Sequence, residues 1–463
     1  MTTNRSNLKR VAFAAASAAA VATFGFAAPA LAEEEMSSAE LLKKIEELQK
    51  QVESLQSNQE ATTRQLTAAE IDAAVARVLD DAEARSDMLS MQGFTAGHNG
   101  KEFVLQNEDG TFKLVPNFQF QLRWVSNILE DAGGGSDFES DEGFEIRRMK
   151  FGVKGNAFSK DLKYDFKWAT NDDGGALILE DAKIAWAFAD NWTFFAGQFK
   201  DPVHFEEITS SSRQMAVDRS LINELIGGGL TDRVQGAGFT YEQDKLKATF
   251  LYHDGINTDN TEFAREAGDG ITPSISPDPP QFGGAARVEY LVFGDSAVKK
   301  DFATIAGNGV DEASLAVGVG ADFTDFGDEE ALIHTADVIY KSGEGQGSYS
   351  LFAAYYGVYT ETGMDTGYTY GFEGLAAYAV TEKMDVFARG SFTDPDDDGF
   401  LGDDDFFEAT VGGNYYFANH SAKVTVDVTY LFDGTPDSAS GIGVRSGDDD
   451  DQIIVRGQFQ LLI

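Results

Sequence analysis

The stretch N-F-Q-F-Q-L-R-W, residues 117–124, alternates strictly between two kinds of side chain. Phe118, Phe120, Leu122 and Trp124 fall on one parity, and the residues between them are polar. Successive side chains of a β-strand point to opposite faces, so this pattern predicts a strand with one apolar face and one polar face. The same period recurs to the end of the chain, for example in K-V-T-V-D-V-T-Y (423–430). The sequence therefore predicts an all-β fold from about residue 113 onward.

Sixteen alternating segments, each close to ten residues long, follow one another in this part of the chain. They cover 113–127, 144–155, 162–170, 179–189, 192–200, 234–243, 246–254, 284–293, 314–323, 333–341, 348–360, 368–380, 384–393, 407–418, 422–432 and 452–462. Connections after even-numbered segments are mostly short, and those after odd-numbered segments are mostly long and acidic. The exception is 294–313, which is long where a short turn is expected.

An even number of such strands, with short turns at one end and long loops at the other, is typical of an outer-membrane β-barrel. A closed barrel suits lipid because it leaves no strand edge unpaired. The sequence thus predicts a 16-stranded antiparallel transmembrane β-barrel over residues 113–463, with its apolar parity facing lipid and its polar parity facing a water-filled lumen. The alternative is a soluble β-sandwich or propeller.

The N-terminus has the features of a secretory signal peptide. Arg5, Lys9 and Arg10 precede an apolar run over 11–28, and Ala30-Leu31-Ala32 offers a cleavage site. We therefore expect residues 1–32 to be removed and the protein to be exported. The alternative, a transmembrane anchor, fits less well because the run is short and rich in small residues. No later segment approaches 18 consecutive apolar residues.

A different period follows the cleavage site. Spacings of four and three residues separate the apolar positions Leu41, Ile45, Leu48, Val52 and Leu55. This is a heptad pattern, and it predicts an α-helical coiled coil over 33–85. The alternative is a single amphipathic helix packed on its own chain. Residues 86–112 are predicted to be a linker. An even-stranded barrel has both ends on the periplasmic side, so the coiled coil is expected in the periplasm.

Composition argues against an enzyme. The 463-residue chain has no cysteine, which excludes disulfides and thiolate chemistry, and its five histidines form no zinc-protease pattern. It also lacks a G-x-S-x-G elbow and a Walker A loop. The formal net charge is −41, and no nucleic-acid partner is expected.

Several motifs resemble the phosphate-selective porin O and P family over about residues 113–463. They include F-E-I-R-R-M-K-F-G-V-K-G (144–155), L-K-Y-D-F-K-W (162–168), F-A-G-Q-F-K-D-P (195–202), D-R-S-L (218–221) and G-G-N-Y-Y-F (412–417). The resemblance implies a homotrimer of sixteen-stranded barrels whose third loop folds inward and narrows the pore. By order along the chain, that constriction loop is 201–233.

The charges depart from the family pattern at two positions. Asn117 stands where phosphate-selective members have an inward arginine, and Glu207 stands where they have a loop lysine. An arginine pair is retained as Arg147-Arg148. The parity changes between Ile146 and Met149, which predicts a bulge that directs both arginines into the lumen. The alternative is that the pair only anchors carboxylates of the loop.

These observations predict an outer-membrane porin that allows passive diffusion of small hydrophilic or anionic solutes, with a modest anion preference. Outer-membrane lipid surrounds such a barrel. The pore-lining bases are predicted to be Arg123, Arg147, Arg148, Lys150, Lys167, Lys183, Arg213, Arg219, Arg233 and Arg389, and the constriction-loop acids Glu206 and Glu207. The alternative function is a structural tether that links the barrel to the cell wall or to surface partners through the coiled coil.

One acidic loop matches the ligand spacing of a calcium-binding loop. Asp394, Asp396 and Asp398 occupy positions 1, 3 and 5, Gly399 follows at position 6, and Asp405 stands at position 12. This spacing predicts Ca²⁺ in an extracellular loop. The alternative is an ordinary solvated acidic loop, and no other cofactor is expected.

Overall fold

The computed structural model divides the chain into two units, residues 1–86 and 87–463. It describes residues 43–44, 46–54, 73, 75–79, 93–99, 102–129, 139–170, 174–258, 260, 275–276, 278–362, 365–396, 401, 405–432, 434–435, 441–445 and 450–463. The predicted signal peptide and the heptad positions Leu41, Ile45 and Leu55 lie outside these residues. Residues 43–44, 46–54, 73 and 75–79 are helical, and Leu48 and Val52 are exposed. The coiled coil stays a prediction.

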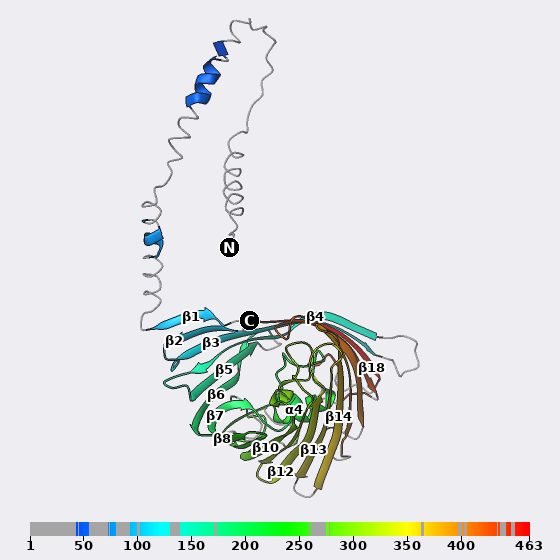
Figure 1. The fold of residues 1–463 in the computed structure, drawn as a ribbon. Coiled ribbons are helices and arrows are strands. Elements are labelled where there is room, and N and C mark those ends of the chain that lie inside the picture. Colours follow the sequence, from blue (N-terminus) through cyan, green and yellow to red (C-terminus); the bar gives the residue numbers. More distant parts are fainter. Residues whose placement is uncertain are drawn as a thin grey trace. The chain divides into compact units, whose positions relative to one another are not determined.

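The second unit is built around a closed antiparallel barrel (Figure 1). Each of its sixteen described strands pairs with the next, and the last pairs with the first, in register from Gln452↔Leu129 to Leu462↔Gln119. The strands are β3 (Lys113–Leu129), β4 (Glu139–Asn156), β5 (Leu162–Thr170), β6 (Leu177–Ala189), β7 (Trp192–Lys200), β8 (Arg233–Gln243), β9 (Leu246–His253), β10 (Phe282–Phe293), β11 (Ser314–Asp325), β12 (Glu329–Lys341), β13 (Tyr349–Thr362), β14 (Asp365–Thr381), β15 (Met384–Asp394), β16 (Phe406–Ala418), β17 (Ala422–Phe432) and β18 (Gln452–Leu462). Each of the sixteen predicted segments corresponds to one of them, so the predicted architecture is confirmed.

Many polar side chains point to the inside of the barrel, and apolar ones cover the outside. Arg456 and Asp427 are each 1% exposed, whereas Val426 is 51% exposed and Phe144 is 76% exposed. A soluble sandwich would bury the apolar set and expose the charged set. The observed arrangement suits a barrel surrounded by lipid. In the described part of the chain, no helix has the length and apolar character needed to cross a bilayer.

The segment predicted to be a linker, 86–112, contains two strands instead. β1 (Phe94–His98) pairs with β2 (Phe103–Asn107), and β2 joins the barrel through Leu105↔Leu114 and Gln106↔Lys113 of β3. The linker prediction is wrong for these residues. The sequence did not reveal the two strands, because five residues are too short for a convincing alternation. Their pairing also depends on β3, which lies later in the sequence.

Two connections fill much of the barrel interior. One, residues 201–232, is called the inward segment below, and it contains α4 (Phe205–Ile208) and η1 (Asn223–Thr231). The strands surround α4 in Figure 1. The other is the 294–313 connection, which contains η2 (Ser296–Lys300). Their apolar residues pack into one buried cluster with side chains of β11–β16, including Met215, Ile222, Phe302, Ile333 and Phe352.

Candidate functional site

The inward segment is held by side chains of distant strands. Its two ends meet where the Asp201 N–H donates to the Asp232 carbonyl (2.9 Å). Between the ends, strand side chains bind its backbone: Arg287 donates to Val203 O (2.7 Å), Lys423 to Gln214 O (2.6 Å) and Asn414 to Met215 O (3.0 Å), while Asp427 accepts from Val217 N–H (2.7 Å) and Glu408 from Leu221 N–H (2.6 Å). Buried backbone groups must find partners, so these contacts position the segment inside the barrel.

Four arginines surround the carboxylate of Asp218 on the inward segment. Its side chain is fully buried and contacts Arg123, Arg147 (3.0 Å), Arg148 (3.5 Å) and Arg456 (3.8 Å). Burial opposes ionisation of Asp218, but the arginine charges outweigh it and hold the pKa of this carboxyl well below its usual range. This cluster joins the inward segment to β3, β4 and β18.

The predicted bulge at the arginine pair is confirmed. Gln121 pairs with Arg148 and Leu122 pairs with Ile146, which leaves Arg147 as the extra residue of β4. Both arginines therefore reach the interior. They bind Asp218 and also line a cavity, so the two interpretations of the pair do not exclude each other.

The two glutamates of α4 have different surroundings. Glu206 accepts hydrogen bonds from Ser220 and lies 3.4 Å from Arg389. Burial raises its pKa, although Arg389 opposes the shift. Glu207 contacts Lys200, Arg219 (3.2 Å) and the amide of Asn223 (3.0 Å). Burial opposes ionisation of Glu207 too, but Arg219 and Lys200 prevail and lower its pKa.

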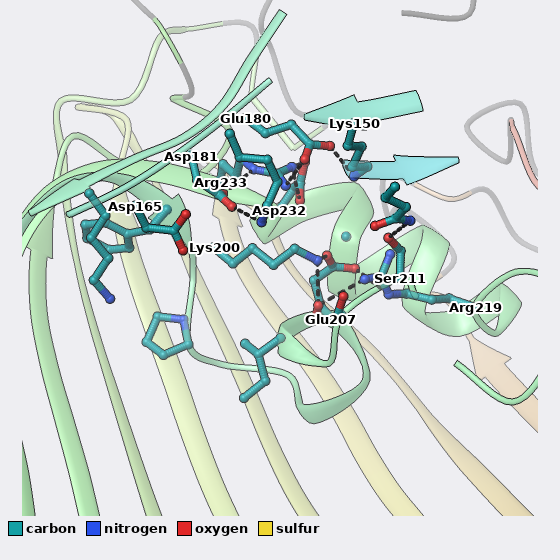
Figure 2. Close-up of a pocket in the computed structure, with 18 of the residues that line it drawn as sticks. Lys150, Asp165, Glu180, Asp181, Lys200, Glu207, Ser211, Arg219, Asp232 and Arg233 are labelled. Carbon is teal, nitrogen blue, oxygen red and sulfur yellow. Dashed lines mark hydrogen bonds and ion pairs between the residues drawn. The ribbon is translucent and has the colours of Figure 1, made fainter. Parts of the chain in front are cut away.

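A cavity of about 630 Å³ lies between the inward segment and the inner faces of β3–β9 (Figure 2). The described residues that line it include nine basic and six acidic side chains. The basic ones are Arg147, Arg148, Lys150, Lys167, Lys183, Lys200, Arg219, Arg233 and Lys247, and the acidic ones are Asp165, Glu180, Asp181, Glu207, Glu224 and Asp232.

A second cavity of about 330 Å³ shares Asp165 and Lys183 with the first. It adds Lys113, Lys154 and Lys163, which lie where β3 begins, β4 ends and β5 begins. The two cavities together lead from the inward segment toward the short-turn end of the barrel.

Ion pairs neutralise most charges of the larger cavity. Lys150 pairs with Glu180, Lys167 with Asp181, and Arg233 with Asp181 (3.0 Å), Asp232 (3.0 Å) and Glu180 (3.4 Å), as Figure 2 shows in part. A second bulge places both acids inside: Lys167 pairs with Asp181 and Trp168 with Leu179, so Glu180 is the extra residue of β6. The sequence prediction missed this bulge, although it lies at adjacent acids, L-E-D-A.

Lys183 differs from the other bases of this cavity. Within the described residues, no carboxylate lies at ion-pair distance from it. Its ammonium instead lies 4.3 Å from the ring centroid of Phe195 and 5.0 Å from that of Phe199. Aromatic faces attract cations without cancelling their net charge. Lys183 therefore presents a positive charge that belongs to no described ion pair where the two cavities meet.

Seven of the ten predicted bases line the larger cavity, and three do not. Arg123 is buried against Asp218, Arg389 is buried between Glu206 and Glu408, and Arg213 points to Asp301 of the 294–313 connection (3.1 Å). Of the two predicted acids, Glu207 lines the cavity and Glu206 does not. Lys200 and Lys247 were missed, although Lys247 alternates with the apolar residues of β9 as the other inward bases do.

The proposed calcium ligands are described only in part. Asp394 ends β15, and the Asp396 carboxylate accepts the Tyr368 N–H of β14 (2.9 Å). Asp398 lies outside the described residues. Among the residues that are described, no group of three or more acidic or histidine side chains has the geometry of a metal centre. The calcium site stays a prediction.

Comparison with known proteins places this barrel in a family. The sequence matches the family model for the phosphate-selective porin O and P over residues 118–462. The chain belongs to this family. A search of curated proteins finds no match. Family and fold identify a channel protein of the bacterial outer membrane.

Solved structures with the same fold include other outer-membrane proteins. The porin matches the structure of Salmonella typhi OmpF in complex with daunomycin, with 18% identity, a TM-score of 0.50, and coverage of 76% of this chain and 99% of that one. It also matches the anion-selective porin from Comamonas acidovorans, with 12% identity, a TM-score of 0.49, and coverage of 76% of this chain and 99% of that one. A third match is the outer-membrane channel DcaP of Acinetobacter baumannii, with 13% identity, a TM-score of 0.48, and coverage of 77% of this chain and 99% of that one. At such low identities these likenesses concern the fold alone.

Proposed function

We propose that this porin is a passive diffusion channel for small hydrophilic solutes, with a modest preference for anions. The path runs through the two cavities along β3–β9, and the inward segment narrows it. The observation that carries the proposal is the excess of bases in the larger cavity, nine against six acids.

Charges in a narrow path act on ions more strongly than charges at its mouth. The protein and membrane around a constriction have a low dielectric constant and focus the field on a passing ion. Charges in the outer loops are screened over about 8 Å at physiological salt. The basic cavity therefore outweighs the acidic loops in setting the selectivity.

Glu224 strengthens this preference near neutral pH. It lies on η1 and lines the larger cavity. Burial raises its pKa to about 7, although Arg147 opposes the shift. A substantial fraction of this carboxyl is then protonated at neutral pH, which removes negative charge from the path.

A modest preference fits better than strong phosphate selectivity. Glu207 replaces the loop lysine of phosphate-selective members, and here its carboxylate pairs with Lys200 and Arg219. One negative charge therefore offsets part of the charge of two cavity bases, where the family pattern would add a further positive charge. Asn117 likewise supplies no charge where the pattern has an arginine.

We further propose that three copies of the chain assemble. The outer face of the barrel exposes large apolar residues such as Phe144 and Ile146, and part of this face can pack against a neighbouring barrel. The heptads then run parallel in the periplasm, one from each subunit.

Reversal potentials of the purified porin in a salt gradient test the function. We expect a modest anion preference that weakens in Arg148→Ala, since the variant lacks one positive charge of the cavity. The inward segment should keep its position, because Arg123, Arg147 and Arg456 still hold Asp218. Lys383→Ala, in an exposed turn, is the control. A cation preference that Arg148→Ala leaves unchanged would mean that the acidic loops set selectivity. A folded barrel that conducts no ions would favour the tether.

A further inference from the structure

The 294–313 connection enters the barrel from the end opposite to the long loops. It joins β10 to β11 at the short-turn end, which is the periplasmic end of outer-membrane barrels. Its residues 301–305 are each at most 1% exposed. Strand and turn groups bind their backbone: Lys341 donates to Ala303 O (3.0 Å), Gly345 N–H to Thr304 O (2.7 Å) and the Ser350 hydroxyl to Phe302 O (2.5 Å).

Two contacts join this connection to the inward segment. The Phe302 ring packs against Phe205 of α4, with centroids 5.5 Å apart, and against Phe352 of β13, 5.1 Å apart. Beside it, the Arg213 guanidinium donates to the Asp301 carboxylate (3.1 Å). The inward segment is thus supported from the periplasmic end by one apolar contact and one ionic contact.

Asp301 is the centre of this support. It is 1% exposed, and besides Arg213 its carboxylate contacts Lys341 (3.0 Å), Asn308 (3.4 Å) and His420 (3.4 Å). These partners belong to β12, to the connection itself and to the turn between β16 and β17. Burial opposes ionisation of Asp301, but Lys341 and His420 outweigh it and lower its pKa. The carboxylate is therefore charged at neutral pH.

We propose that Asp301 is a positioning residue for the pore constriction and that the 294–313 connection is a strut under the inward segment. On one side the inward segment packs into the buried apolar cluster that contains Ile333 and Phe352, and on the other it borders the open cavity along β3–β9. If the strut loosens, the cavity is the direction in which the segment can move. The strut therefore keeps the path open. This inference rests on the proposed function only in treating the cavity as the path of ions.

Asp301→Asn tests the strut, with Asp311→Asn as the matched control. The control makes the same change in the same connection at an exposed position. In single-channel recordings we expect Asp301→Asn to show frequent partial closures and a mean conductance at least twofold lower, while Asp311→Asn matches the unmodified porin. Hydrogen exchange of the backbone amides in 205–220 should become about tenfold faster in Asp301→Asn alone, because a buried charge-assisted contact is lost.

A second variant separates positioning from folding. Arg213→Gln removes the contact to the inward segment but leaves Asp301 paired with Lys341, so the barrel retains its internal anchor. We expect the same partial closures. The mean conductance of the double variant should be no lower than that of Asp301→Asn, because the two residues act through one contact.

Steady traces and unchanged exchange in folded Asp301→Asn and Arg213→Gln would overturn the inference. If the unmodified porin conducts no ions, the proposed function fails, while the exchange comparison still decides whether the strut exists.

Discussion

Replacing Lys183 by glutamine removes the one base of the larger cavity that has no ion-pair partner among the described residues. The substitution breaks no ion pair among the described residues, and the Lys183 ammonium lies over the Phe195 and Phe199 rings, which belong to β7. The inward segment is held by other residues, such as the arginines around Asp218. The path should therefore keep its width in Lys183→Gln, and any change should be electrostatic.

The size of the effect follows from Coulomb's law. An ion that passes at about 5 Å from a unit charge interacts with it by ~0.8 kcal/mol in water, and screening at physiological salt reduces this to ~0.4 kcal/mol. That energy changes the local concentration of an ion about twofold. Because the anion is attracted and the cation is repelled, the anion-to-cation permeability ratio should fall roughly fourfold in Lys183→Gln.

Reversal potentials across a planar bilayer in a potassium chloride gradient measure this ratio directly. Lys383→Gln, in an exposed turn outside both cavities, makes the same chemical change and should leave the ratio unaltered. Single-channel conductance should stay within a factor of about two in both variants. A permeability ratio in Lys183→Gln equal to that of the unmodified porin would refute the argument that the Lys183 charge in the path controls selectivity.

Four further outcomes are expected. Asp218→Asn leaves four arginines around a neutral amide, which should destabilise the folded barrel by about 3 kcal/mol and expose the inward segment to protease; melting of the barrel on gels measures the first effect and mapping of cleavage sites the second. The anion preference should rise as the pH falls from about 8 to about 6, because Glu224, whose pKa is about 7, takes up a proton; Glu224→Gln should weaken this dependence in reversal-potential titrations. If the 394–405 loop binds calcium, millimolar Ca²⁺ should raise the melting temperature of the porin but not of Asp396→Asn, and an equal response in both would contradict the site. Leu48→Cys treated in the membrane with a cross-linker that carries three thiol-reactive groups should give covalent trimers, and products that stop at dimers would contradict a three-stranded coiled coil.

The alternation of side chains was enough to predict the barrel. Strand parity is a local property, since each residue points opposite to its neighbour. Stretches such as 117–124 and 423–430 show it as a strict alternation of polar and apolar residues. The bulge at Arg147 was predictable for the same reason, because the parity changes there. The strands β1 and β2 were not predictable, because they are too short to show a clear alternation.

Which charges are open to solvent in the interior was decided by the tertiary structure. Arg123, Lys183 and Arg389 share the inward parity, yet the inward segment covers Arg123 and Arg389 and leaves Lys183 in the cavity. The inward course of the 294–313 connection likewise depends on Lys341, Ser350 and Phe352, which follow it in the sequence. Alternation specifies the face of the sheet to which a side chain belongs. Only long-range contacts determine what lies against that face, because buried charges and backbone groups must find partners wherever the folded chain supplies them.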